Sequence, residues 1–187
     1  MKMIRLRFIC LLFTIAATVL PLTGCGDLVE IQDRDFVLAL GIAYARGQYQ
    51  VTYSLPNLSD ITDQATAGQN NLLRTYEGKS LAEAEQIYNA NSENRLDYRH
   101  LQTIIIDATI CENEQAMKEL LLQIDDKYDI SHNVLVYFSR VELTDIMGME
   151  SINGSIGEHL KKLNSNNYVG GMESSKIGAL INCITNE

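Results

Sequence analysis

The sequence predicts an α+β domain in which a mixed sheet of about five strands packs with about three or four helices. Short runs rich in β-branched and aromatic side chains occur at residues 36–44, 49–55 and 100–107, and such runs are typical of strands. Apolar residues repeat at helical spacing in residues 81–91 and 114–125. Because strand and helix patterns alternate along a chain of ordinary domain size, we expect a single mixed domain.

The first two predicted strands form a hairpin. Residues 36–44 are almost wholly apolar, which indicates a strand buried on both faces, and residues 49–55 alternate between apolar and polar. Residues 46–48, Arg-Gly-Gln, lie between the two strands and supply a turn. Residues 56–71 are polar and have no period, so we predict a surface loop after the hairpin.

A third strand and the first helix follow. Residues 72–77 have strand character, and a glycine at position 78 ends them. Ser80 and Glu83 have the spacing of a capping box, so the helix is predicted over residues 81–91. Residues 100–107 contain three consecutive isoleucines and predict a central strand.

The second half of the chain predicts further helices around one more strand. Residues 114–125 form an amphipathic helix, and residues 133–139 a strand with apolar side chains on both faces, so we expect helices to cover both faces of the sheet. Ser155 and Glu158 form a second capping box ahead of a short helix. An apolar stripe over residues 177–184 predicts the last helix.

The N-terminal segment has the architecture of a secretory signal peptide. Basic side chains at positions 2, 5 and 7 precede residues 8–20, which are apolar except for two threonines. This run is shorter than the roughly 20 apolar residues that a membrane-crossing helix needs. We therefore predict that residues 1–24 are removed as a signal peptide, with an uncleaved anchor as the alternative.

A lipoprotein processing site is predicted at the end of that segment. Leu22, Thr23, Gly24 and Cys25 resemble the bacterial lipobox, in which an aliphatic and two small residues precede a cysteine that takes up a diacylglycerol on its sulfur. Cys25 would then become the first residue of the mature chain, and its two acyl chains would give durable membrane attachment. We predict residues 25–35 to be the lipid-anchored tether. An ordinary signal peptide followed by an unrelated cysteine is the alternative.

The charge of the predicted mature chain limits its partners. After residue 24 the sequence holds 24 acidic and 12 basic side chains. Nucleic acids and anionic lipid headgroups both attract Lys and Arg, so we predict no nucleic-acid partner, and attachment to the bilayer through the lipid instead of through surface charge.

No catalytic residue, metal site or cofactor is predicted. Ser92, Asp97 and His100 fall within nine positions of one another, but no nucleophile motif surrounds the serine, so we interpret the stretch as a polar loop. The acidic run at residues 125–129 lacks the alternate-position ligands of a calcium-binding loop.

The other histidines, His132 and His159, lack the spacing of metal ligands. The 72-residue separation of Cys111 and Cys183 leaves open whether they pair or stay free.

Three segments, in this order, resemble a known family. Residues 24–31 resemble a Gly-Cys-Trp-Asp-x-x-Glu-Ile opening, with Gly26 in place of the tryptophan. Residues 95–101, ahead of the isoleucine strand, are similar to a Leu-x-x-x-His segment, and residues 133–137 fit a later strand. Over about residues 20–150 the chain resembles the N-terminal region of the spore germination receptor C-subunit lipoproteins, the Ger(x)C family.

The resemblance implies a non-enzymatic subunit of a spore germinant receptor. It would lie on the outer face of the inner spore membrane and assemble with membrane-embedded receptor subunits. Residues 36–187 would be the family's N-terminal α+β domain, and we expect the family's C-terminal domains to be absent. In that frame His100 would be a hydrogen-bonded structural residue at a strand start. An extracytoplasmic solute-binding lipoprotein of a transporter is the alternative function, and an extracytoplasmic enzyme a more distant one.

Overall fold

The computed structural model describes residues 33–56, 72–149, 155–165 and 174–185. The chain divides into two units, residues 1–32 and residues 33–187, and all described residues belong to the second. The predicted signal peptide, its lipobox and the first part of the tether lie outside the described residues, as does most of the predicted loop at 56–71.

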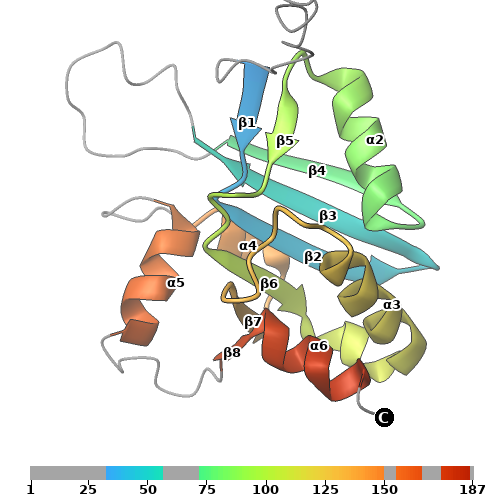
Figure 1. Ribbon diagram of the computed structural model, residues 1–187. Helices are drawn as coiled ribbons and strands as arrows, with labels where there is room; N and C mark the ends of the chain where they lie inside the picture. Colours follow the sequence, from blue (N-terminus) through green and yellow to red (C-terminus); the bar gives the residue numbers. More distant parts are fainter. Residues whose placement is uncertain (1–32, 57–71, 150–154, 166–173, 186–187) are drawn as a thin grey trace, which may run out of the picture. The chain divides into compact units, whose positions relative to one another are not determined.

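A six-stranded mixed sheet forms the centre of the second unit (Figure 1). The strand order is β4-β3-β2-β6-β7-β8, with β2, β6 and β7 parallel and the other neighbours antiparallel. The α+β class is thereby confirmed, with one strand more in this sheet than the five or so expected. The strands are β2 (Ala39–Ala45), β3 (Gln48–Leu55), β4 (Leu72–Gly78), β6 (Thr103–Asp107), β7 (Leu135–Ser139) and β8 (Ser174–Lys176).

The predicted hairpin is confirmed as β2 and β3, joined by a two-residue turn. Arg46 and Gly47 have φ angles of 54° and 80°. Positive φ at both central residues is the feature of the turn type whose twist matches that of the flanking strands, and glycine adopts it without steric cost.

The predicted strand at residues 36–44 is wrong in one respect, because the structure splits it. Residues Arg34–Phe36 form β1, and β2 begins only at Ala39. The Val37 N–H donates to the Asp97 carbonyl oxygen and the Leu38 N–H to the Ser54 carbonyl oxygen. Between Val37 and Leu38 the chain therefore stops pairing with the segment at Asp97 and starts pairing with the segment at Ser54.

The first of those pairings is a separate two-stranded parallel sheet of β1 with β5 (Arg95–Asp97). Its register places Arg34 beside Arg95 and Phe36 beside Asp97. Arg34 and Asp35, which the sequence analysis assigns to the tether, therefore lie in a strand of the fold.

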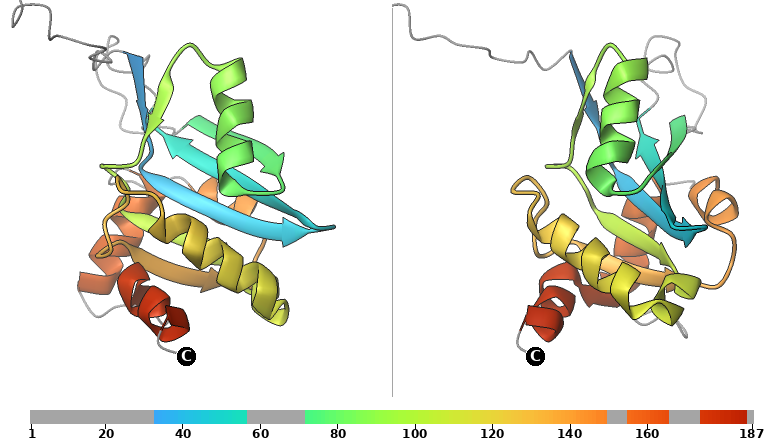
Figure 2. Two further views of the ribbon diagram at one scale, coloured as in Figure 1. Left: turned by 45° about the vertical axis from the view of Figure 1, so that its right-hand side comes forward. Right: turned by 90° about the vertical axis from the view of Figure 1, so that its right-hand side faces the viewer.

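Five α-helices in the described part of the chain cover the sheet on both faces (Figure 2). Both predicted capping residues act as caps, since the Ser80 Oγ accepts from the Glu83 N–H at 3.1 Å and the Ser155 Oγ from the Glu158 N–H at 3.2 Å. The helices are α2 (Leu81–Asn91), α3 (Glu114–Asp125) and α6 (Ile177–Thr185) on one face, and α4 (Leu143–Met147) and α5 (Ile156–Ser165) on the other, with a 3₁₀ helix, η4 (Ala108–Glu112), after β6.

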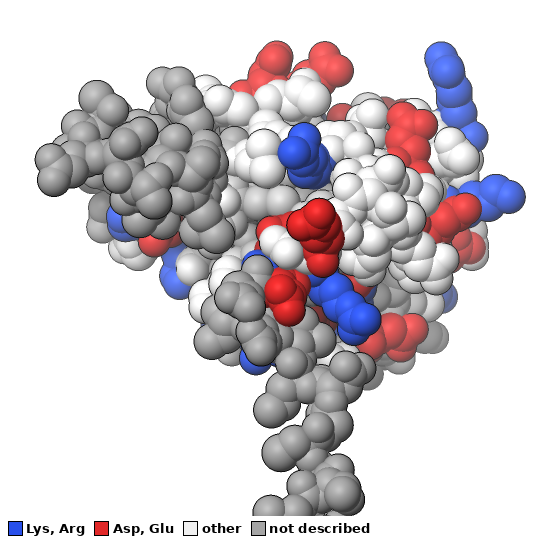
Figure 3. All heavy atoms as spheres, turned by 90° about the horizontal axis from the view of Figure 1, so that it is seen from above, with Lys and Arg blue, Asp and Glu red and all other residues white. Residues whose placement is uncertain are grey.

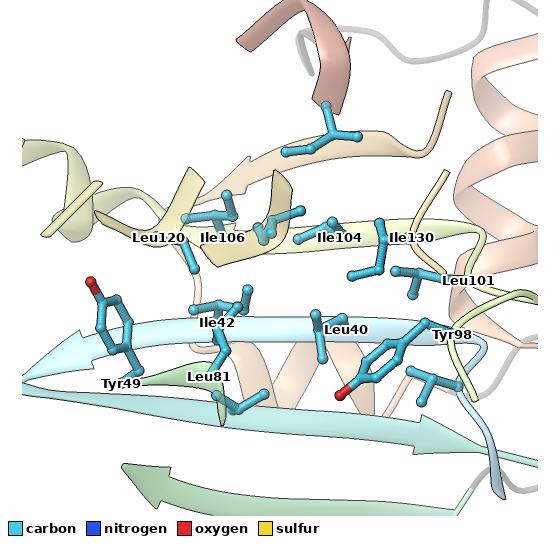
Figure 4. Packing of buried hydrophobic residues seen from close by; sticks show 14 of the residues in the cluster. Leu40, Ile42, Tyr49, Leu81, Tyr98, Leu101, Ile104, Ile106, Leu120 and Ile130 are labelled. Atoms are coloured by element: carbon cyan, nitrogen blue, oxygen red, sulfur yellow. The ribbon is translucent and has the colours of Figure 1, made fainter. Parts of the chain in front are cut away.

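Two hydrophobic cores lie on opposite faces of the sheet. Strands β6 and β7 contribute to both, because their successive side chains point to opposite faces. Ile104 and Ile106 of β6 enter the larger core, where they meet α3 (Figure 4), and Ile105 between them enters the smaller core against α4 and α5. Val136 and Tyr137 divide in the same way on β7. The prediction that helices cover both faces is confirmed.

Helix α5 packs against the sheet backbone through a glycine. A Cβ atom on Gly157 would lie 2.6 Å from the Leu38 carbonyl oxygen, so only glycine allows this approach without a shift of the helix. The Thr103 Oγ1 donates to the Gly157 carbonyl oxygen at 3.1 Å. The smaller core is closed by this contact at the start of β2 and β6.

Candidate functional site

The N-terminal strand β1 is held by a carboxylate at its centre, Asp35. Its Oδ2 accepts hydrogen bonds from the Tyr88 hydroxyl and, at 3.2 Å, from the Ser92 hydroxyl. Its Oδ1 accepts from the Asn94 side-chain amide at 3.1 Å. Because Tyr88 lies in the last turn of α2 and the other two donors lie between α2 and β5, Asp35 ties the strand to the end of that helix.

A second carboxylate, Asp97, joins β1 to β5. Its side chain is 4% exposed and pairs with Arg34 at 2.9 Å between Nη1 and Oδ2. Arg99 donates to it from Nε at 2.9 Å and from its backbone N–H at 3.0 Å. Hydrogen bonds from Arg99, and then from Arg34, hold the pKa of this carboxyl well below its usual range.

A third polar cluster connects α2 with the segments that follow β5 and α3. Glu85 accepts from the Tyr98 hydroxyl at 3.2 Å and pairs with Lys127. The Lys127 Nζ also lies 4.7 Å from the centroid of the Tyr98 ring, within the range of a cation–π contact. Burial raises the pKa of Tyr98, so the phenol stays a neutral donor.

The predicted lipidation residue Cys25 and the lipobox residues Leu22, Thr23 and Gly24 lie outside the described residues. Their assignment remains a prediction from the local sequence pattern.

Ser92, Asp97 and His100 are not assembled as a nucleophile with its base. Ser92 donates to Asp35, and Asp97 is occupied by arginines. His100 is exposed, and its ring lies edge-on to Phe36 at 4.8 Å between centroids. This aromatic contact differs from the hydrogen bond that the resemblance implied, because His100 lies in the turn ahead of β6, which begins three residues later.

The structure also describes the acidic run at 125–129 and the two cysteines that the sequence analysis considers. In the acidic run at 125–129, the Asp125 Oδ1 lies 3.1 Å from the His132 Nε2. Cys111 and Cys183 are exposed free thiols, so the structure does not pair them. Across the described ranges, no group of three or more His, Cys, Asp or Glu side chains is arranged to hold a metal ion, and no helix there is long and apolar enough to cross a membrane.

Sequence reasoning missed Asp35 and misjudged Asp97. Asp35 fell within the predicted tether, and Asp97 was considered only as a member of a catalytic arrangement. The available signal was weak, because β1 and β5 have three residues each and too few side chains to show a period. Their partners lie about sixty residues apart in sequence, so only the fold reveals the pairing.

Replacing Asp97 with asparagine should lower the free energy of unfolding by about 1–3 kcal/mol at pH 7, because charge-assisted hydrogen bonds are lost. A depressed pKa contributes stability that is present above the unfolded-state pKa, about 3.9, and is lost as pH falls toward the folded-state value. The difference between wild type and Asp97→Asn should therefore stay constant from pH 7 to 5 and shrink below about pH 4 in urea melts.

Glu112→Gln is the matched control, because this exposed carboxylate on η4 should give little change at any pH. An Asp97→Asn difference that is equally large at pH 3 and pH 7 would contradict the assigned role of the charge.

Comparison with known proteins gives one match. A family model described as "Spore germination protein N-terminal domain" matches residues 27–187, which include every strand and helix of the described fold. No curated protein and no solved structure matched. The match covers more than half of the chain and agrees with the resemblance to the Ger(x)C family. The chain therefore belongs to the spore germination proteins that carry this N-terminal domain.

Proposed function

We propose that the chain is a lipid-anchored, non-enzymatic subunit of a spore germinant receptor, acting as a scaffold or adapter domain. The observation that carries the proposal is the family match over residues 27–187, which begins two residues after Cys25. A lipobox immediately ahead of a germination domain is the arrangement expected of an exported, membrane-attached subunit.

The use of polar side chains in the domain supports a binding role. Asp35, Glu85 and Asp97 each accept several hydrogen bonds that join secondary-structure elements, so their chemistry serves the fold. The hydrogen bonds of these three carboxylates do not form the nucleophile-and-base arrangement that general acid–base or covalent catalysis requires.

The proposed partners are membrane-embedded receptor subunits, reached on the outer face of the inner spore membrane. The lipid on Cys25 supplies attachment to the bilayer, and the acidic surface favours basic extracytoplasmic loops on the partner. Such complementarity chiefly raises the rate of encounter and sets orientation, and adds less to affinity.

The test is recovery of partners from spore membranes. Tagged chain, isolated from gently solubilised membranes, should bring down multi-span membrane proteins that an untagged control preparation does not yield. Failure to recover any of them, together with micromolar binding of an amino acid or sugar by the domain, would favour a solute-binding lipoprotein of a transporter instead.

A further inference from the structure

One end of the domain is where the chain enters it from the predicted tether. This entry end comprises Arg34, at the start of β1, and residues 91–95, which run from the last residue of α2 to the first of β5. Parallel pairing sets Arg34 beside Arg95, and the Asp35 hydrogen bonds bring Ser92 and Asn94 to the same place. The start of β1, the start of β5 and the end of α2 lie together at the top of Figure 1.

The length of the tether limits which end of the domain can face the bilayer. Nine residue steps separate Cys25 from Arg34. Even fully extended, they span at most about 30 Å. A domain of this size has a radius of gyration of about 15 Å and so measures about 40 Å across. Because the tether is shorter than the domain, the end opposite Arg34 cannot be turned toward the membrane.

Strand β1 is firmly held within the domain at the entry end. β1 is held by its pairing with β5, by three hydrogen bonds to Asp35 and by the ion pair of Arg34 with Asp97. The Val37 N–H adds a hydrogen bond to the Asp97 carbonyl oxygen. Because β1 is fixed to α2 and β5, the limit on the distance between Arg34 and the bilayer also applies to the end of α2 and the start of β5.

The chemistry of the entry end favours a protein partner over lipid headgroups. Asn91, Glu93 and Arg95 are exposed there, and the last turn of α2 holds no basic residue to offset the partial negative charge of the helix C-terminus. Figure 3 looks onto this end, and among the described residues visible there acidic and basic side chains are interspersed without a broad basic patch. Binding to anionic headgroups takes clusters of Lys and Arg.

We propose that the entry end is the surface by which the domain docks onto an extracytoplasmic loop of a membrane-embedded partner, and that the loop presents Lys, Arg or amide donors to Glu93 and the C-terminal end of α2. The inference rests on the proposed function and adds to it a contact surface and the chemistry of its partner.

Photo-crosslinking in the full-length chain tests the surface. A benzophenone amino acid at position 93 should give an adduct with a multi-span membrane protein, identified by mass spectrometry, several-fold more abundant than the adduct from position 183. Position 183 is the matched control, because Cys183 is exposed and belongs to α6, a helix that lies at the opposite end of the domain in Figure 1. Adducts with lipid alone at position 93, or stronger protein adducts at position 183, would overturn the proposal.

Charge reversal tests the chemistry of the same surface. Glu93→Lys should lower recovery of the partner about tenfold, through loss of attraction and like-charge repulsion. The same reversal on η4, Glu112→Lys, should leave recovery unchanged. Equal recovery with both variants would overturn the proposed loop chemistry.

Lipid labelling of Cys25 and recovery of partners by the unmodified chain are measured on the same membranes. If both are present and position 93 gives no adduct, the docking surface is wrong and the proposed function stands. If both are missing, the proposed function is wrong as well.

Discussion

Replacing Cys25 with serine is expected to abolish incorporation of labelled lipid and to leave the full-length precursor uncleaved. In the predicted processing the Cys25 thiol would be the nucleophile that accepts the diacylglycerol, and a serine hydroxyl is a far weaker nucleophile because it is not ionised near neutral pH. Since cleavage follows lipid transfer, the precursor should accumulate with residues 1–24 attached. Labelling with a radioactive or clickable fatty acid, followed by electrophoresis, measures both changes.

Cys111→Ser is the control for that experiment. Cys111 is an exposed free thiol in the folded domain, so its loss should leave lipid labelling and cleavage unchanged. Label that persists in Cys25→Ser, or that never enters the wild type, would refute the predicted processing site and with it the proposed anchor.

Replacing Ile105 with alanine is expected to lower the free energy of unfolding by about 2–5 kcal/mol. Ile105 lies in the middle of β6, is 1% exposed, and belongs to the smaller core with Tyr137 and Met147. Truncation removes buried methyl groups and leaves a cavity that α5 cannot fully close, since Gly157 of this helix already lies against the backbone at Leu38. Urea or guanidinium melts of the domain measure the effect.

Leu122→Ala is the matched control, because it truncates an aliphatic side chain that is 41% exposed on α3. Its cost should stay below about 1 kcal/mol. If Ile105→Ala also costs less than about 1 kcal/mol, β6 is not the central strand that the sequence and the structure indicate.

The long helices and strands were predictable because their signals are local. Helices α2 and α3 occupy the predicted residues 81–91 and 114–125, since each has an apolar period of several turns, which in α2 follows a predicted capping residue. The same holds for the β2–β3 hairpin, where turn chemistry and alternation occur in adjacent residues.

The short strands were not predictable, for a physical reason. β1, β5 and β8 have three residues each, mostly polar, and each owes its strand conformation to a partner distant in sequence. These strands form only when their partners are brought beside them in the folded domain, so local residue propensity does not predict them.

The residues of the candidate site also fall into those that local sequence predicts and those whose role depends on pairing of distant segments. Cys25 was predicted from four adjacent residues, and the family from the order of short segments. Asp35 and Asp97 acquire their roles only when β1 lies beside β5, which sequence spacing did not show.

The parallel pairing of β1 with β5 also determines how the domain would bear mechanical load. The proposed membrane anchor would pull at the N-terminal end of β1, and tension along that strand would slide it past β5 instead of peeling it away. In this shear geometry, the ladder hydrogen bonds, the three bonds to Asp35 and the Arg34–Asp97 pair resist together, whereas peeling would break them one after another. Detachment of the strand under force is governed by the rate of unfolding, and sharing the load among these contacts keeps that rate low.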